Sequence, residues 1–125
     1  MGYVRYNTNP VSNLVGDCVV RAISILTDET WDDVYWGIAI QGFLMKDMPS
    51  SNSVWGKYLT LKGFRRGVIP NTYPACYSVR EFCMEHPYGK YLLATGSHVI
   101  AIVDGDYYDT WDSGDEIPIY YWERR

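Results

Sequence analysis

The sequence predicts one α+β domain spanning residues 1–125, in which N-terminal helices pack on a C-terminal antiparallel sheet. Two observations predict this fold class. Apolar residues recur at helical spacing between residues 18 and 62, whereas β-branched and aromatic runs separated by turn residues dominate residues 91–122. The 125 residues fit a single domain, and the hydrophobic fraction of 47% is enough to form a core. Helices followed by strands in this order are typical of an arrangement with the helices on one side of the sheet.

The first predicted helix is short and mostly buried. Residues 1–16 are rich in Asn, Pro and Gly, and we expect them to be irregular. Asp17 then occupies an N-cap position, and apolar residues recur at helical spacing over residues 18–26.

Two further helices are expected before the sheet. Thr30 caps a helix over residues 31–45, whose acidic first turn suits the positive end of a helix. A third helix over residues 54–62 ends at Gly63, a residue favoured at helix C-termini. The side chains that we expect on the buried side of the second helix are Val34, Tyr35, Ile38, Phe43 and Leu44.

The second half of the chain has mainly strand signals. Residues 64–69 fit a strand or an extended loop, and Ser78 can cap a short helix that runs to Glu85. Asp104-Gly105 is a typical hairpin turn, which predicts antiparallel pairing of the strands on either side of it. The predicted strands lie at residues 91–94, 98–103, 106–111 and 117–122.

Composition excludes several classes of function. The net charge of -4 and the short basic stretches give no reason to expect nucleic acid or an anionic membrane as a partner. No segment approaches the roughly 20 apolar residues of a membrane span. Three widely spaced cysteines without a secretory signal favour a reducing cytoplasm over a disulfide framework. With only two histidines, we expect no metal site and no other cofactor.

Cys18 is the first candidate for chemistry. It stands in the first turn of the predicted helix, where backbone N–H groups stabilise a negative charge and therefore a thiolate. Gly16, two residues earlier, lets a substrate approach the backbone closely. A lone cysteine in such a place is more often structural, so its partners decide the interpretation.

His98 and Asp109 are the partners that the predicted hairpin supplies. His98 opens the most apolar strand, from which it can reach the helix start and act as general base and acid for Cys18. A tight turn at residues 104–105 brings Asp109 beside His98, where its carboxylate can orient the imidazole. Asp112 is the alternative acid, and strand alternation favours Asp109.

The order of these three residues resembles that of the papain-like cysteine peptidase superfamily. There the cysteine opens the central helix, the histidine opens a sheet strand, and Asn or Asp follows on the next strand. Papain-type enzymes carry Asn-Ser-Trp at that third position, and this chain carries Asp-Thr-Trp at residues 109–111. The resemblance implies a papain-like fold and a Cys18–His98–Asp109 triad.

A second part of the resemblance lies before the first helix. The string at residues 16–18, with the hydrophobic helix after it, is similar to that of bacteriocin-leader-processing peptidases and small phage-encoded relatives. The resemblance covers residues 12–27 and 91–112. These families usually place a Gln before the cysteine as an oxyanion donor, and this chain has none there. Asn13 offers the same amide on a shorter arm, with Ser12 and Asn7 as the alternatives.

Two functions of different kinds follow from these residues. The first is a cysteine hydrolase that cleaves an amide, peptide or isopeptide bond of a peptide or protein through a thioester intermediate. Transfer to an amine or action on a cell-wall peptide would use the same residues. The second is a catalytically inactive papain-like binding module, such as a phage-encoded inhibitor of a host factor, with Trp31, Trp36 and Trp55 exposed for contact.

Overall fold

The computed structural model describes residues 2–72 and 74–124, which form helices on both faces of a mixed sheet. Its helices are α1 (Cys18–Thr27), α2 (Trp31–Met45), α3 (Asn52–Leu61) and α4 (Val79–Glu85). Its strands are β1 (Gly2–Arg5), β2 (Phe64–Val68), β3 (Lys90–Ala94), β4 (Val99–Val103), β5 (Asp106–Asp109) and β6 (Tyr120–Arg124). The predicted α+β class is confirmed.

The sheet has six strands in the order β1-β5-β4-β3-β6-β2. The hairpin register predicted from the turn is confirmed, because Val103 pairs with Asp106 and Ile102 with Tyr107. The expectation of a purely antiparallel sheet is wrong. β1 pairs with β5 in parallel, and the backbone N–H of Tyr6 continues the pairing by donating to the carbonyl of Asp109 at 3.0 Å.

Strand β1 lies in a segment expected to be irregular. The turn formers of residues 1–16 come after Arg5, and the free backbone edge of β5 makes an extended Gly2–Arg5 favourable through hydrogen bonds that local sequence does not reveal. The last strand also differs from its expected bounds of 117–122. It begins at Tyr120, since Pro118 has no N–H to give to a neighbouring strand.

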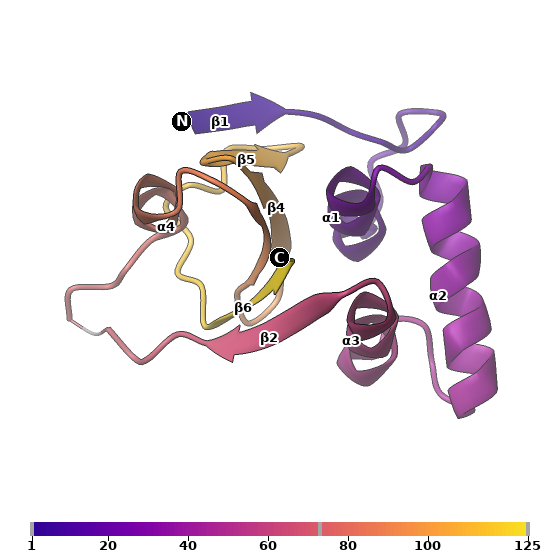
Figure 1. Ribbon diagram of the computed structural model, residues 1–125. Helices are drawn as coiled ribbons and strands as arrows, with labels where there is room; N and C mark the ends of the chain where they lie inside the picture. Colours follow the sequence, from indigo (N-terminus) through magenta and orange to yellow (C-terminus); the bar gives the residue numbers. More distant parts are fainter. Residues whose placement is uncertain (1, 73, 125) are drawn as a thin grey trace.

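Helices cover both faces of the sheet (Figure 1). Helices α1 and α3 pack on one face, whereas α4 packs on the other, so the expectation of helices on one side alone is wrong. The physical reason is that the central strands β3 and β4 place apolar side chains on both faces of the sheet. Leu92 and Ala101 enter the core beneath α1 and α3, and their neighbours Leu93 and Ile102 enter the core beneath α4.

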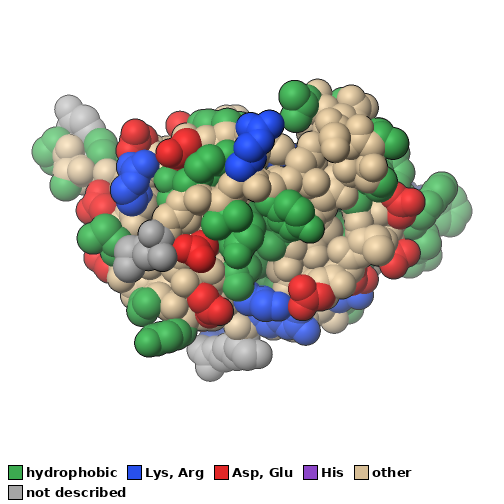
Figure 2. All heavy atoms as spheres, turned by 90° about the horizontal axis from the view of Figure 1, so that it is seen from above, with side chains coloured by type: hydrophobic (Ala, Val, Ile, Leu, Met, Phe, Trp, Pro, Cys, Tyr) green, Lys and Arg blue, Asp and Glu red, His purple; other side chains and the backbone are tan. Residues whose placement is uncertain are grey.

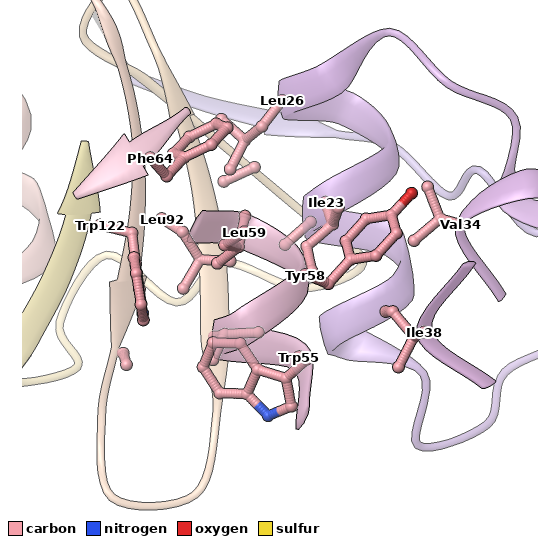
Figure 3. Close-up of a cluster of buried hydrophobic side chains, with 14 of the residues drawn as sticks. Ile23, Leu26, Val34, Ile38, Trp55, Tyr58, Leu59, Phe64, Leu92 and Trp122 are labelled. Atoms are coloured by element: carbon pink, nitrogen blue, oxygen red, sulfur yellow. The ribbon is translucent and has the colours of Figure 1, made fainter. Parts of the chain in front are cut away.

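The larger core joins three helices to the sheet (Figure 3). Ile23 and Leu26 of α1 meet Leu59 of α3, and all three are fully buried. Leu92 and Trp122 contribute the sheet side of the same cluster. This packing fixes the position of α1, and therefore of its first residue, against the central strands.

Helix α2 has the predicted bounds but not the predicted buried side. It packs on α1 and α3, outside the layer that touches the sheet (Figure 1). The buried residues of α2 are spaced one turn apart and form a narrow stripe: Val34, Ile38 and Gly42. Tyr35, Phe43 and Leu44 are exposed, contrary to expectation, because two neighbouring helices cover only this stripe.

The surface carries charges of both signs. On the face shown in Figure 2, acidic and basic side chains are interspersed with hydrophobic ones. Among the residues that the structure describes, no helix is both long and apolar enough to cross a membrane. In the same part of the chain, no group of three or more His, Cys, Asp or Glu side chains is placed to hold a metal ion.

Candidate active site

Cys18 is the first residue of α1 and is half-buried. The first N–H groups of a helix have no partner within the helix, so they point at this end and favour negative charge there. Helix α1 packs on β4, and this brings its start to the end of the strand where His98 lies. The sulfur is therefore held at the junction of helix and sheet.

His98 lies one residue before β4, in the turn that joins β3 to β4. Thr95 fixes this turn: its hydroxyl accepts a hydrogen bond from the backbone N–H of His98 at 3.0 Å, and its own N–H donates to the carbonyl of His98 at 2.8 Å. The imidazole Nε2 bonds to the carboxylate of Asp109 at 2.6 Å. Nδ1 is thereby left for the side of the ring that faces Cys18.

Asp109 ends β5 and is 3% exposed. Besides His98, its carboxylate accepts hydrogen bonds from the hydroxyl of Ser113 and from the backbone N–H of Thr110, both at 2.8 Å. A guanidinium nitrogen of Arg21 lies 3.6 Å from the same carboxylate. These contacts hold the carboxylate in one orientation toward the imidazole.

Asp112, the alternative acid, has other partners. It accepts a hydrogen bond from the hydroxyl of Tyr107 at 2.6 Å and lies 3.6 Å from a guanidinium nitrogen of Arg80. The structure thus brings together Cys18, His98 and Asp109, and it directs Asp112 to a different set of contacts.

The electrostatics of Cys18 and His98 favour a thiolate beside an imidazolium. Burial raises the pKa of Cys18, but hydrogen bonds from the His98 side chain and the Val99 backbone, with the charges of His98 and Arg21, outweigh it, and the pKa falls below its ordinary value. Burial lowers the pKa of His98, but the hydrogen bonds and charges of Asp109 and Cys18 raise it to about 9. Both shifts favour the thiolate–imidazolium form of the pair over the form in which both groups are neutral.

This ion pair predicts the pH dependence of thiol alkylation. In the wild-type protein, the rate at which iodoacetamide alkylates Cys18 should rise with a midpoint below the thiol's ordinary pKa of 9.0, because the thiolate is the reactive form. In His98→Ala, the midpoint should move up toward that value. Cys83, whose burial raises its pKa to about 11, is the internal control and should react slowly throughout. Mass spectrometry of each peptide measures the rates, and an unchanged midpoint in His98→Ala would contradict the ion pair.

Sequence reasoning missed Arg21, the buried cation of the site. Its Nε bonds to Asp17 at 2.9 Å, and its Nη1 lies between the hydroxyl of Thr110 at 3.4 Å and the carboxylate of Asp109. The signal was present in the sequence, since Asp17 and Arg21 are four residues apart on a helix start and so face each other.

Asp17 differs from its expected role. It occupies the N-cap position of α1, but its side chain makes no capping hydrogen bond. One carboxylate oxygen accepts from Arg21, and the other accepts from the indole N–H of Trp31 at 2.9 Å. Because the buried guanidinium competes for this carboxylate, Asp17 links α1 to α2 and to the site rather than closing the helix end.

A cleft of about 580 Å³ opens beside Cys18 and His98. Trp111 also lines this cleft, and its ring lies beside that of His98, with 5.1 Å between the ring centres. Asn13 lines this cleft, as expected of an oxyanion donor, whereas Ser12 and Asn7 do not line it. A smaller cleft of about 180 Å³ adjoins the other side of Cys18 and His98.

No protein-family model matches this chain, and neither a curated protein nor a solved structure shows significant similarity to it.

Proposed function

We propose that the protein is a papain-like cysteine hydrolase that cleaves an amide, peptide or isopeptide bond. The observation that carries the proposal is the 2.6 Å contact between His98 and Asp109, with Cys18 and His98 together lining an open cleft. Nucleophile, base and orienting acid in mutual contact are the arrangement that acyl transfer requires. Buried structural cysteines lack both the cleft and the partner.

The first half of the reaction forms a thioester. The Cys18 thiolate attacks the carbonyl carbon, and a C–S bond forms as the carbonyl electrons move to oxygen. His98 then gives its proton to the leaving nitrogen, and the C–N bond breaks. Asp109 keeps the imidazole in the required orientation and stabilises its positive charge.

The second half consumes water. Neutral His98 takes a proton from water, the resulting hydroxide adds to the thioester carbonyl, and the C–S bond breaks to release a carboxylic acid and restore the thiolate–imidazolium pair. The backbone N–H of Cys18 and the amide of Asn13 are the proposed donors to the oxyanion. Cys18, His98 and water supply every proton and electron pair of these steps, so no cofactor enters them. An amine in place of water would give transfer instead of hydrolysis.

We extend the proposal to the class of substrate and the compartment. The open cleft suits an extended peptide or a protein terminus, and a free thiolate persists best in a reducing compartment such as the cytoplasm.

The proposal predicts a covalent acyl-enzyme at Cys18. Incubation with activated peptidyl esters should add the mass of the acyl group to Cys18, and peptide aldehydes should protect this thiol from iodoacetamide. Cys18→Ala should show no adduct, and Cys76, which is exposed, controls for simple accessibility. Intact-protein and peptide mass spectrometry detect both effects. A Cys18 that reacts no faster than Cys76 and forms no acyl adduct would overturn the proposal.

One observation favours the second candidate, a binding module. The outer side of α2 exposes Trp36, Ile40, Phe43 and Leu44 at helical spacing, with Trp36 at 65% exposure. The expectation for the other two tryptophans is wrong. Trp55 of α3 is buried in the larger core. Trp31 is half-buried, and its indole N–H donates a hydrogen bond to Asp17. Absence of an acyl adduct would favour this candidate over hydrolysis.

A further inference from the structure

Helix α2 is apolar on two opposite sides. Its inner side, with Val34 and Ile38, is buried against α1 and α3, and the helix itself lies at the outer edge of the molecule (Figure 1). No charged residue stands between Asp33 and Lys46. A surface helix normally carries polar residues on the side away from the core, whereas a helix that is hydrophobic all round is normally covered all round. The outer side of α2 therefore has the composition of a buried surface.

The apolar residues of this outer side form one continuous surface, which we call the outer stripe. They recur at intervals of three or four residues, so they share one face of the helix, and each is at least 55% exposed. The members of the outer stripe are Trp36, Ile40, Phe43 and Leu44. An exposed apolar surface on a folded domain commonly marks a site of association with another molecule.

The outer stripe is complementary to a second copy of itself. Ile40 lies near its middle, four residues after Trp36 and four before Leu44. When two α2 helices pack antiparallel about a two-fold axis at Ile40, each Trp36 meets Leu44 and Phe43 of the other copy. A two-fold dimer requires this kind of surface, in which one patch on both chains is its own complement.

The charges at the two ends of α2 fit the same arrangement. Asp32 and Asp33 lie in the first turn, and Lys46 is the C-cap residue. The ammonium of Lys46 lies 3.9 Å from the centre of the Phe43 ring, and therefore beside the outer stripe. Antiparallel packing brings the acidic end of each helix opposite the Lys46 end of the other, so the attraction occurs twice. A parallel pair would instead place the two acidic ends together.

Other occupants of this face are less well matched. The remaining charge at the C-terminal end, Asp47, is directed to its own chain, where its carboxylate accepts hydrogen bonds from the hydroxyl of Ser53 and from the next backbone N–H. Helices that lie on anionic membranes are rich in Lys and Arg, whereas residues 31–46 contain Lys46 alone. The pattern of charges thus favours a second copy of this chain over an anionic lipid surface.

We propose that the protein forms a two-fold dimer through the outer stripes of two α2 helices, packed antiparallel about Ile40. The clefts that contain Cys18 are lined by other residues than those of the outer stripe. The dimer is therefore independent of the proposed hydrolase chemistry, and either can fail without the other.

The test measures the mass of the purified protein by sedimentation equilibrium, from micromolar to submillimolar concentration. The wild-type protein should reach twice the mass of one chain. Ile40→Lys brings two like charges together on the two-fold axis and should remain a monomer throughout. Met84→Lys is the matched control, because Met84 of α4 is 57% exposed, against 55% for Ile40, and lies on the opposite face of the sheet. It should dimerise as the wild-type protein does, and circular dichroism checks that both variants fold.

Charge reversal tests the antiparallel direction. Asp33→Lys and Lys46→Asp should each raise the Kd of the dimer by about threefold or more, because two symmetric pairs change from attraction to repulsion. The double variant, which exchanges the two charges, should dimerise more tightly than either single variant.

Urea unfolding provides a second measurement that needs no variant. The unfolding midpoint of a dimer rises with protein concentration, so the wild-type midpoint should rise and that of Ile40→Lys should not. A wild-type protein that stays monomeric at every concentration, with α2 left for a different protein or a membrane, would overturn the inference. So would a dimer that Ile40→Lys leaves intact, or a double charge variant that is no tighter than the single ones.

Discussion

Replacing Asp109 by Ala should lower the rate of hydrolysis by about 10²- to 10⁴-fold, the range that general acid–base catalysis contributes. Asp109 is bonded to Nε2 of His98 at 2.6 Å and is the main group that raises the histidine pKa to about 9. Without it, only Cys18 opposes the effect of burial, so the pKa of His98 falls and the imidazolium beside the Cys18 thiolate is less favoured. The falling limb of the pH–rate profile should accordingly move down from about pH 9. Rates with a peptidyl ester, measured across pH, check both effects.

The matched control is Asp112→Ala, because Asp112 is three residues away and bonds to Tyr107 instead of His98. Its hydrolysis rate and pH profile should stay close to those of the wild-type protein. Asp109→Asn separates orientation from charge, since its amide oxygen can still accept from the imidazole, and we expect a loss smaller than that of Asp109→Ala. Equal losses in Asp109→Ala and Asp112→Ala would contradict the role of Asp109 as the orienting acid.

Replacing Arg21 by Met should lower the free energy of unfolding by about 3–5 kcal/mol, the cost of leaving buried carboxylates without their cation. Arg21 is 8% exposed and bonds to Asp17, and it lies 3.6 Å from Asp109. Methionine retains most of the length and volume of the side chain, so the effect reports the charge rather than a cavity. Urea unfolding at neutral pH measures this free energy. Its dependence on urea concentration should be compared between the variants.

Arg80→Met is the control for this loss. Arg80 also pairs with two carboxylates, those of Asp112 and Asp115, but on the surface, where water and salt screen the attraction. Its loss should be far smaller than that of Arg21→Met. Similar losses for the two arginines would show that Asp17 and Asp109 do not depend on a buried cation.

Much of the site was accessible from local sequence. The turn at residues 104–105 determines the hairpin register, and this register places Asp109 beside His98. The helix that begins at Cys18 was predicted from the spacing of apolar residues, because the periodicity of an amphipathic helix can be recognised in a short stretch of sequence. Ser78 begins α4 with the predicted cap. These features involve residues close in the chain, whose conformations depend on their immediate neighbours.

The remaining features depend on contacts between distant segments. Local sequence did not indicate that β1 would pair with β5, since a strand edge more than a hundred residues away supplies its hydrogen bonds. The buried side predicted for α2 was only partly right, since Val34 and Ile38 are buried but Tyr35, Phe43 and Leu44 are exposed. That helix is apolar on more than one side, and only the positions of α1 and α3 determine that Val34 is buried and Phe43 is not.

Local sequence predicted the elements from α1 onward and the approach of Asp109 to His98, because helix periodicity, caps and a tight turn act over short chain distances. Packing between distant segments was needed for the approach of Cys18 to His98, the placement of α4 opposite the other helices and the contact of Arg21 with Asp109. The physical reason is that burial and buried charge pairing belong to the assembled chain. A side chain acquires them only when the segments that surround it have packed.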